Sequence, residues 1–191
     1  MGKGMKRLFI ALGILVILFG INQMQQSGRG SSSDYVFNLE RDNIFSFNIT
    51  KGEEAITLQF NGESWVIKGN DTLVVKENTM NSFFSNILEV KRTSLVSKNS
   101  AKWEKFNVSD TTGTRLVLID HNGKTLGQVI VGRSNAEWSS SNIRVGDEQE
   151  VYQTNKNISW QLDTSPTHWG EVPSPPEPDS TAVDSIQQPI L

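Results

Sequence analysis

At 191 residues, the chain has room for one ordinary domain, since soluble domains most often run to about 100–150 residues. Its net charge of -3 gives no broad attraction for nucleic acid, so we expect no nucleic-acid partner. The absence of cysteine excludes disulfides, thiol nucleophiles and cysteine zinc sites, and with two distant histidines we expect no metal and no cofactor.

The first 24 residues have the pattern of a membrane anchor. "MGKGMKR" carries basic residues and no acid, and an uncharged apolar run from Leu8 to Ile21 follows it. Such a run enters the lipid bilayer with its basic end in the cytoplasm. As a helix it spans about 21 Å, less than the roughly 30 Å hydrocarbon core, so its length lies between a signal-peptide core and a short anchor. No small-residue cleavage site follows, which favours an uncleaved single-pass anchor in residues 1–24 over a cleaved signal or a buried core helix.

Two polar segments flank one folded domain. Residues 25–34, "QQSGRGSSSD", have the composition of a flexible linker. Residues 171–191 hold five of the six prolines, four acids and no basic residue, which predicts a disordered tail because little apolar surface offsets the ordering entropy. Residues 35–170 then form the domain. It lies outside the cytoplasm whether the N-terminal segment is an anchor or a cleaved signal.

The first part of the domain alternates as β-strands do. "NIFSFNIT" places Phe45, Phe47 and Ile49 on one face of a strand. "AITLQFNGESWVI" alternates on both sides of Asn61-Gly62. Both central residues of a type I′ turn need positive φ, so Asn-Gly between alternating runs predicts a hairpin.

Residues 76–91 break this alternation and predict the main helix. Their apolar residues recur at helical spacing, and Asn78 or Thr79 can cap the N-terminus. We expect an amphipathic helix of about three turns, each buried side chain contributing roughly 1.5–3 kcal/mol. Its buried stripe should consist of Phe83, Phe84, Ile87 and Leu88.

The remaining segments return to strands. "RTSLVS" predicts a strand, after which Trp103 and Phe106 should face inward. Residues 115–132 predict a hairpin that turns at Asn122-Gly123, and residues 140–155 predict another with "GDEQ" at its tip. The fold class is therefore α+β, with a twisted antiparallel sheet built from hairpins and packed on one main helix. One helix covers one face, leaving the other for solvent or a partner.

Residues 120–125, "DHNGKT", carry the most suggestive chemical fragments. A phosphate-binding loop needs a glycine five residues before Gly123 and a helix after it, but an apolar strand residue and a strand stand there. Asp120 and His121 are neighbours that point in different directions, and no serine lies in an activating motif. We therefore expect no enzymatic activity and no catalytic residue. A hydrolase centred on His121 or His168 is the weakest alternative.

Two residues are candidates for contact with a partner. Trp138, in the polar loop "RSNAEWSSSN", should be exposed, whereas the other four tryptophans alternate with apolar residues or close an element and should lie in the core. Arg144 could bind an anion, although an outward cross-strand pair with a neighbouring acid is the favoured interpretation.

The order of these features carries a family resemblance. "WVI" precedes the helix, "FNV" introduces a strand and an "NGK" hairpin that ends in "VIVG", and "NIRV" with "VY" follows. This order resembles the bacterial family called domain of unknown function 4340 over residues 40–165, with departures at Asn142 and Ile143. The matching residues are Trp65, Ile67, Phe106, Val108, Gly123, Lys124, Val129, Gly132, Arg144, Val151 and Tyr152.

The resemblance implies a location and a setting. Members are membrane-anchored, extracytoplasmic and often encoded beside ABC-type transporter subunits related to gliding-motility components, and no catalytic residues are established for them. Many carry further copies of the sheet unit, whereas this chain has one. We expect a non-enzymatic accessory domain in the cell membrane, held by Leu8 to Ile21 with its N-terminus in the cytoplasm, that contacts a membrane complex such as an ABC-type transporter. A glycan- or peptide-binding module of the cell envelope is the alternative.

Overall fold

A computed structural model describes residues 35–135 and 137–173 of the protein. The predicted anchor (residues 1–24) and linker (residues 25–34) lie outside these residues, as does the predicted tail from residue 174 onward. Within the described residues, no helix is both long enough and apolar enough to cross a membrane.

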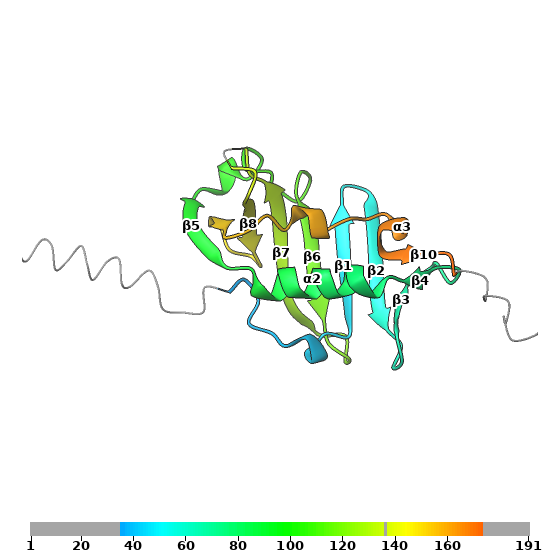
Figure 1. Cartoon of the computed structure of the whole chain (residues 1–191). Coiled ribbons are helices and arrows are strands. Elements are labelled where there is room, and N and C mark those ends of the chain that lie inside the picture. The colour runs from blue at the N-terminus through cyan, green and yellow to red at the C-terminus, as the bar shows by residue number, and fades with distance from the viewer. Residues whose placement is uncertain (1–34, 136, 174–191) are drawn as a thin grey trace, which may run out of the picture.

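The described residues form a large sheet with one long helix lying across it (Figure 1). The helices are α2 (Glu77–Glu89), α3 (Pro166–Trp169) and the 3-10 helices η1 (Arg41–Asn43), η2 (Ser100–Lys102) and η3 (Ser159–Gln161). The strands are β1 (Ser46–Lys51), β2 (Glu54–Phe60), β3 (Trp65–Ile67), β4 (Val74–Val75), β5 (Arg92–Ser97), β6 (Thr114–Ile119), β7 (Thr125–Arg133), β8 (Ser141–Val145), β9 (Val151–Thr154) and β10 (Gly170–Glu171).

The main sheet is antiparallel and has eight strands among the described residues, in the order β3-β2-β1-β6-β7-β8-β9-β5. The helix α2 crosses these strands, so the chain leaves one edge of the sheet near β3 and joins the other edge as β5 (Figure 1). A separate pair joins β10 to β4, with Glu171 opposite Val74. The α+β prediction of an antiparallel sheet with one main helix is confirmed.

The predicted hairpins are present, but their turns are longer than a two-residue type I′ turn. In each Asn-Gly pair the glycine has positive φ, 104° at Gly62 and 80° at Gly123, and the asparagine does not. In the second hairpin, the N–H of Asp120 donates to Lys124 and the N–H of Gly123 donates to Asp120, with a register shift in the flanking strands. This is the pattern of a turn closed by a left-handed glycine and a bulge. Asn122 and Asn61 therefore do not need positive φ.

The helix α2 begins without the predicted side-chain cap. Among the described residues, no side chain caps its N-terminus, and Lys76 occupies the cap position instead of Asn78 or Thr79. The N–H of Lys76 donates to the carbonyl oxygen of Trp169 at 2.8 Å, and its Nζ donates to that of Thr167 at 2.7 Å. The first turn of α2 is thus held by contacts with α3, which is about 91 residues away in the sequence. The residues around position 76 give no sign of these contacts.

The face of the sheet under α2 holds the main core, and aromatic rings fill its centre. Phe47 of β1 stacks on Phe83 of α2 with 4.2 Å between ring centroids. Trp169 lies 5.4 Å from Phe47 and 5.3 Å from Phe83, and its Nε1 donates to the carbonyl oxygen of Asp163 at 2.8 Å. The predicted stripe of α2 is confirmed at Phe83 and at its buried neighbours Phe84 and Ile87, with Met80 added, whereas Leu88 is half-buried.

Of the residues that the structure describes, those on the opposite face of the sheet cover it at one end only. The segment after η2 packs Val108 on Ile130 of β7 and Val151 of β9, with the predicted inward-facing Trp103 and Phe106 at its margin. Over β1 and β2 this face is polar: the Nδ2 of Asn48 donates to the carbonyl oxygen of Ile56 and to Thr57 Oγ1. The sheet thus carries a second, smaller core beside an open polar surface.

The second core depends on a close approach of backbone to β7 at Gly132. A Cβ at this position would lie 2.3 Å from the carbonyl oxygen of Asn107 and 2.4 Å from that of Phe106, so we expect Gly132→Ala to destabilise the fold by about 1–3 kcal/mol. Gly127→Ala is the control, because its Cβ would meet only a side chain, the ring of Phe37 at 2.9 Å, and no backbone atom. Urea unfolding measures both losses. Equal losses would contradict the importance of the Phe106–Asn107 backbone.

Candidate interaction surface at one end of the sheet

The loop between β7 and β8 presents Trp138 to solvent with 87% of its surface exposed, as the sequence predicts. At Glu137 and Trp138 the backbone is nevertheless held by hydrogen bonds. The N–H of Glu137 donates to Ser134 Oγ at 3.1 Å, and the Nδ2 of Asn157 donates to the carbonyl oxygen of Trp138 at 2.8 Å. A large apolar ring is therefore held out in water on a restrained backbone.

A second exposed indole, Trp160, lies on the neighbouring 3-10 helix η3 with 67% of its surface exposed. The prediction that Trp160 belongs to the core is wrong. Its neighbours Ile158 and Leu162 are buried, and the tight turn of η3 between them directs residue 160 outward. The polar neighbours Ser159 and Gln161 fit a strand with Trp160 on its buried face as well as they fit a turn, so the sequence carries no local signal for the exposed position.

Asn157 connects the two tryptophan-bearing segments. Its Nδ2 donates to the loop at Trp138, while its Oδ1 accepts from the N–H of Ser159 at 3.0 Å and from Ser141 Oγ at 3.0 Å. One side chain thus ties the loop, the first residue of β8 and η3 together. The two segments that carry the exposed indoles are consequently linked by hydrogen bonds at one end of the sheet.

A groove adjoins Trp160 on this end of the sheet; we call it the Trp160 groove. It has a volume of about 1020 Å³ and runs between the turn ends of β1 and β2, the end of β7, and the segment from η3 to α3. Trp138 is not among the described residues that line it. The described charged residues of its lining are Lys51, Glu54, Arg133 and Asp163, with the guanidinium of Arg133 at 5.8 Å from the centroid of the Trp160 ring.

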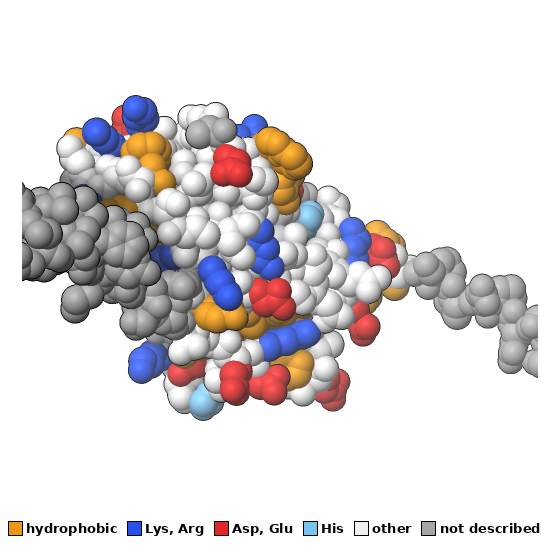
Figure 2. All heavy atoms as spheres, turned by 60° about the vertical axis from the view of Figure 1, so that its left-hand side comes forward, with side chains coloured by type: hydrophobic (Ala, Val, Ile, Leu, Met, Phe, Trp, Pro, Cys, Tyr) orange, Lys and Arg blue, Asp and Glu red, His pale blue; other side chains and the backbone are white. Residues whose placement is uncertain are grey.

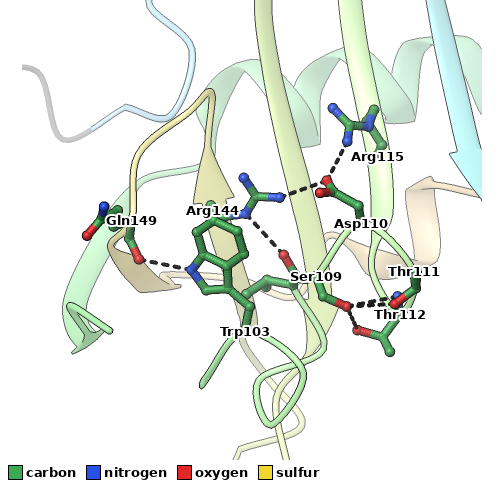
Figure 3. A network of polar contacts seen from close by, with 9 residues as sticks. Trp103, Ser109, Asp110, Thr111, Thr112, Arg115, Arg144 and Gln149 are labelled. Carbon is green, nitrogen blue, oxygen red and sulfur yellow. Dashed lines mark hydrogen bonds and ion pairs between the residues drawn. The ribbon is translucent and has the colours of Figure 1, made fainter. Parts of the chain in front are cut away.

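Arg144, the other predicted contact residue, belongs to a cluster of polar contacts around Trp103 and Asp110 (Figure 3). Its guanidinium lies 4.0 Å from the centroid of the Trp103 ring, its Nε donates to the carbonyl oxygen of Val108 at 3.1 Å, and its Nη2 donates to Asp110 at 2.9 Å. Only 6% of the side chain is exposed. The prediction that Arg144 points outward and pairs with a neighbouring acid is wrong: its side chain is buried, and its acidic partner Asp110 lies in the segment between η2 and β6.

Asp110 holds this cluster together from the solvent side. Its carboxylate pairs with both Arg144 and Arg115, which lie on either side of Ile130 in the same row of the sheet (Figure 3). Trp103 is held in place by its Nε1, which donates to the carbonyl oxygen of Gln149 at 3.0 Å. Two of the three guanidinium nitrogens of Arg144, Nε and Nη2, are thus hydrogen-bonded within the protein.

The residues of the hydrolase alternative do not form a shared site among the described residues. Asp120 accepts hydrogen bonds from the N–H groups of Asn122 and Lys124, both at 2.8 Å, and so closes the β6–β7 turn. The Lys124 hydrogen bond is the largest cause that lowers the pKa of the exposed Asp120 carboxyl. His121 is exposed at this turn, whereas His168 lies in α3 with its ring edge-on to Trp169 at 5.1 Å.

Comparison with known proteins gives one family match. The family model described as "Domain of unknown function (DUF4340)" matches residues 65–187. No curated protein and no solved structure gives a significant match. The matched range begins at Trp65, the first residue of β3, and includes Trp138, Trp160 and Arg144.

Proposed function

The chain belongs to the DUF4340 family, and on this premise we propose that it is a membrane-tethered, extracytoplasmic interaction domain that serves a membrane complex of the ABC transporter type as an accessory component. The N-terminal sequence supports the tether, because basic residues precede the apolar run from Leu8 to Ile21. The exposed side chain of Trp138 supports the contact with a partner, and it is the main observation behind the proposal.

An exposed indole on a fixed backbone has the properties of an interface anchor. Tryptophan is enriched among the few residues that contribute most of the binding energy at protein interfaces. The hydrogen bonds at Glu137 and Trp138 hold the loop before binding, so little conformational entropy is lost when a partner covers the ring. Burying such a ring removes a large apolar surface from water, which favours association.

The sheet edges are less suited to the contact. Within the described residues, the edge strand β3 has three residues, and β5 has two register shifts in its pairing with β9. Short strands and bulges protect an edge against the addition of a further strand. Leu95 of β5 is 47% exposed, but it stands between these two irregularities. We therefore place the contact at Trp138.

The surface charge also favours an apolar anchor. Figure 2 shows positive and negative side chains interspersed over the visible described residues, with apolar side chains in small separate groups. A mixed surface gives little net electrostatic attraction, so a small apolar patch has to supply most of the affinity.

We expect Trp138→Ala to weaken capture of the membrane partner by about thirtyfold or more, as the loss of an interface anchor costs about 2 kcal/mol or more. The full chain, carrying an affinity tag, is purified from detergent-solubilised membranes, and a photo-crosslinking residue at the exposed neighbouring position 139, with Trp138 kept, identifies the neighbour by mass spectrometry. An ABC-type transporter subunit is the expected product.

Trp160→Ala is the matched control, since it removes a second exposed indole from the same end of the sheet. Capture should persist in this variant. Recovery of the full chain alone, or equal capture by the Trp138→Ala protein and the unaltered protein, would overturn the proposal. Unchanged thermal unfolding of both variants shows that the fold is intact.

A further inference from the structure

We propose that the Trp160 groove binds a neutral oligosaccharide, an activity separate from the contact at Trp138. The groove joins an exposed aromatic ring to a polar wall in one concave surface. A sugar has the same two-sided character, because its ring presents a face of C–H groups and an edge of hydroxyl groups. Each side of the ligand therefore has a counterpart in the groove.

The aromatic side of the site is rigid. Trp160 stands on η3, whose flanking residues Ile158 and Leu162 are buried in the main core. The N–H of Leu162 donates back to the carbonyl oxygen of Ser159 at 3.3 Å, and Asn157 holds the start of η3. The backbone that carries the indole is thus held in place, and stacking of a sugar face on the ring buries apolar surface with little cost in backbone ordering.

The charged residues of the lining give the groove no net attraction for a charged ligand. Of the described residues that line the groove, Lys51 and Arg133 are basic and Glu54 and Asp163 are acidic. The opposite signs balance, so neither a polyanion nor a polycation gains net attraction. A neutral ligand rich in hydroxyl groups can use both kinds of side chain, since carboxylates accept hydrogen bonds and cationic groups donate them.

The polar wall is built across distant parts of the chain. Thr164 Oγ1 donates to Glu54 Oε2 at 2.6 Å, and Asp163 accepts from the N–H of Ser165 at 2.7 Å. The first bond closes the wall between the η3–α3 segment and β2. The volume of about 1020 Å³ lies just above the usual range for ligand pockets, about 300–1000 Å³, which suits several sugar residues better than one.

The test uses the full chain in detergent and three uncharged probes: the β-1,4 tetramer of N-acetylglucosamine, the β-1,4 tetramer of glucose and the α-1,4 tetramer of glucose. Intrinsic fluorescence and the NMR signals of the indole N–H groups follow the titration. We expect saturable binding of at least one probe at or below about 1 mM, with a shift of the Trp160 signal, and at least a tenfold loss of affinity in Trp160→Ala.

Two further variants make the result specific to the groove. Trp160→Phe keeps an aromatic face and should retain part of the affinity, and Trp138→Ala should bind the sugars normally. The inference is overturned if none of the probes binds at about 10 mM. It is also overturned if binding is unchanged in Trp160→Ala, or if an uncharged tetrapeptide binds at Trp160 while the sugars do not. Because capture of the membrane partner depends on Trp138, failure here leaves the proposed function standing.

Discussion

Replacing Phe47 by alanine is expected to lower the free energy of unfolding by about 3–5 kcal/mol, the usual cost of removing a large ring from a packed core. Phe47 is fully buried, stacks on Phe83, and lies 5.6 Å from Trp65 and 6.1 Å from Phe84 between ring centroids. Rings from β1, β3 and α2 meet at this position. The neighbours come from different elements and cannot all close on the cavity, so most of the cost remains.

Phe45→Ala is the matched control for this prediction. Phe45 is half-buried, with an edge-to-face contact to Phe60 at 6.4 Å. We expect its loss to cost about 1–2 kcal/mol, since less apolar area leaves water there. Urea unfolding followed by circular dichroism measures both changes, and Phe47→Leu gives an intermediate value if the alanine variant does not fold. Equal costs at positions 45 and 47 would show that the aromatic cluster is not the centre of the core.

Arg144→Ala is expected to lower the free energy of unfolding by about 2–3 kcal/mol. The substitution removes the cation–π contact with Trp103 and leaves the carbonyl oxygen of Val108 without its donor. The ion pair with Asp110 contributes less, because Asp110 is 61% exposed and its charge is screened by water. Most of the loss therefore comes from the buried side of the guanidinium.

Arg144→Lys separates charge from shape. Lysine keeps the charge but lacks the planar fork that reaches both Val108 and Asp110, so we expect it to recover less than half of the loss. Arg115→Ala, which removes only the outer ion pair with Asp110, should cost less than about 1 kcal/mol. If Arg144→Ala abolished capture of the membrane partner without changing stability, Arg144 would be a contact residue and not a structural one.

The surface at the end of the sheet was partly predictable. Trp138 stands in a run of polar residues, so its exposure followed from its neighbours in the sequence. For Trp160 the sequence predicts a core position, because apolar residues stand two positions away on each side, as in a strand. The chain forms a 3-10 turn there, and a turn directs the middle residue away from its flanking neighbours. Only the structure therefore placed Trp160 beside the groove.

The buried position of Arg144 could not be predicted for a different reason. Arg144 lies opposite Ile130 on the sheet face away from α2, and a residue on that face is exposed unless something covers it. The segment that covers it, from Trp103 to Asp110, is brought there by contacts distant in sequence, such as the bond from Trp103 to Gln149. No local pattern around position 144 reports such a contact.

Features that depend on neighbours along the chain could be predicted from the sequence: the alternating strands, the Asn-Gly hairpins, the stripe of α2 and the α+β class. These features follow from the period of apolar residues and the backbone freedom of glycine, which act over a few residues. Four features appear only in the tertiary structure: the order of the strands, the contact between the start of α2 and Trp169, the burial of Arg144, and the groove beside Trp160. Each of these needs segments far apart in sequence to meet, and that meeting depends on how the whole core packs.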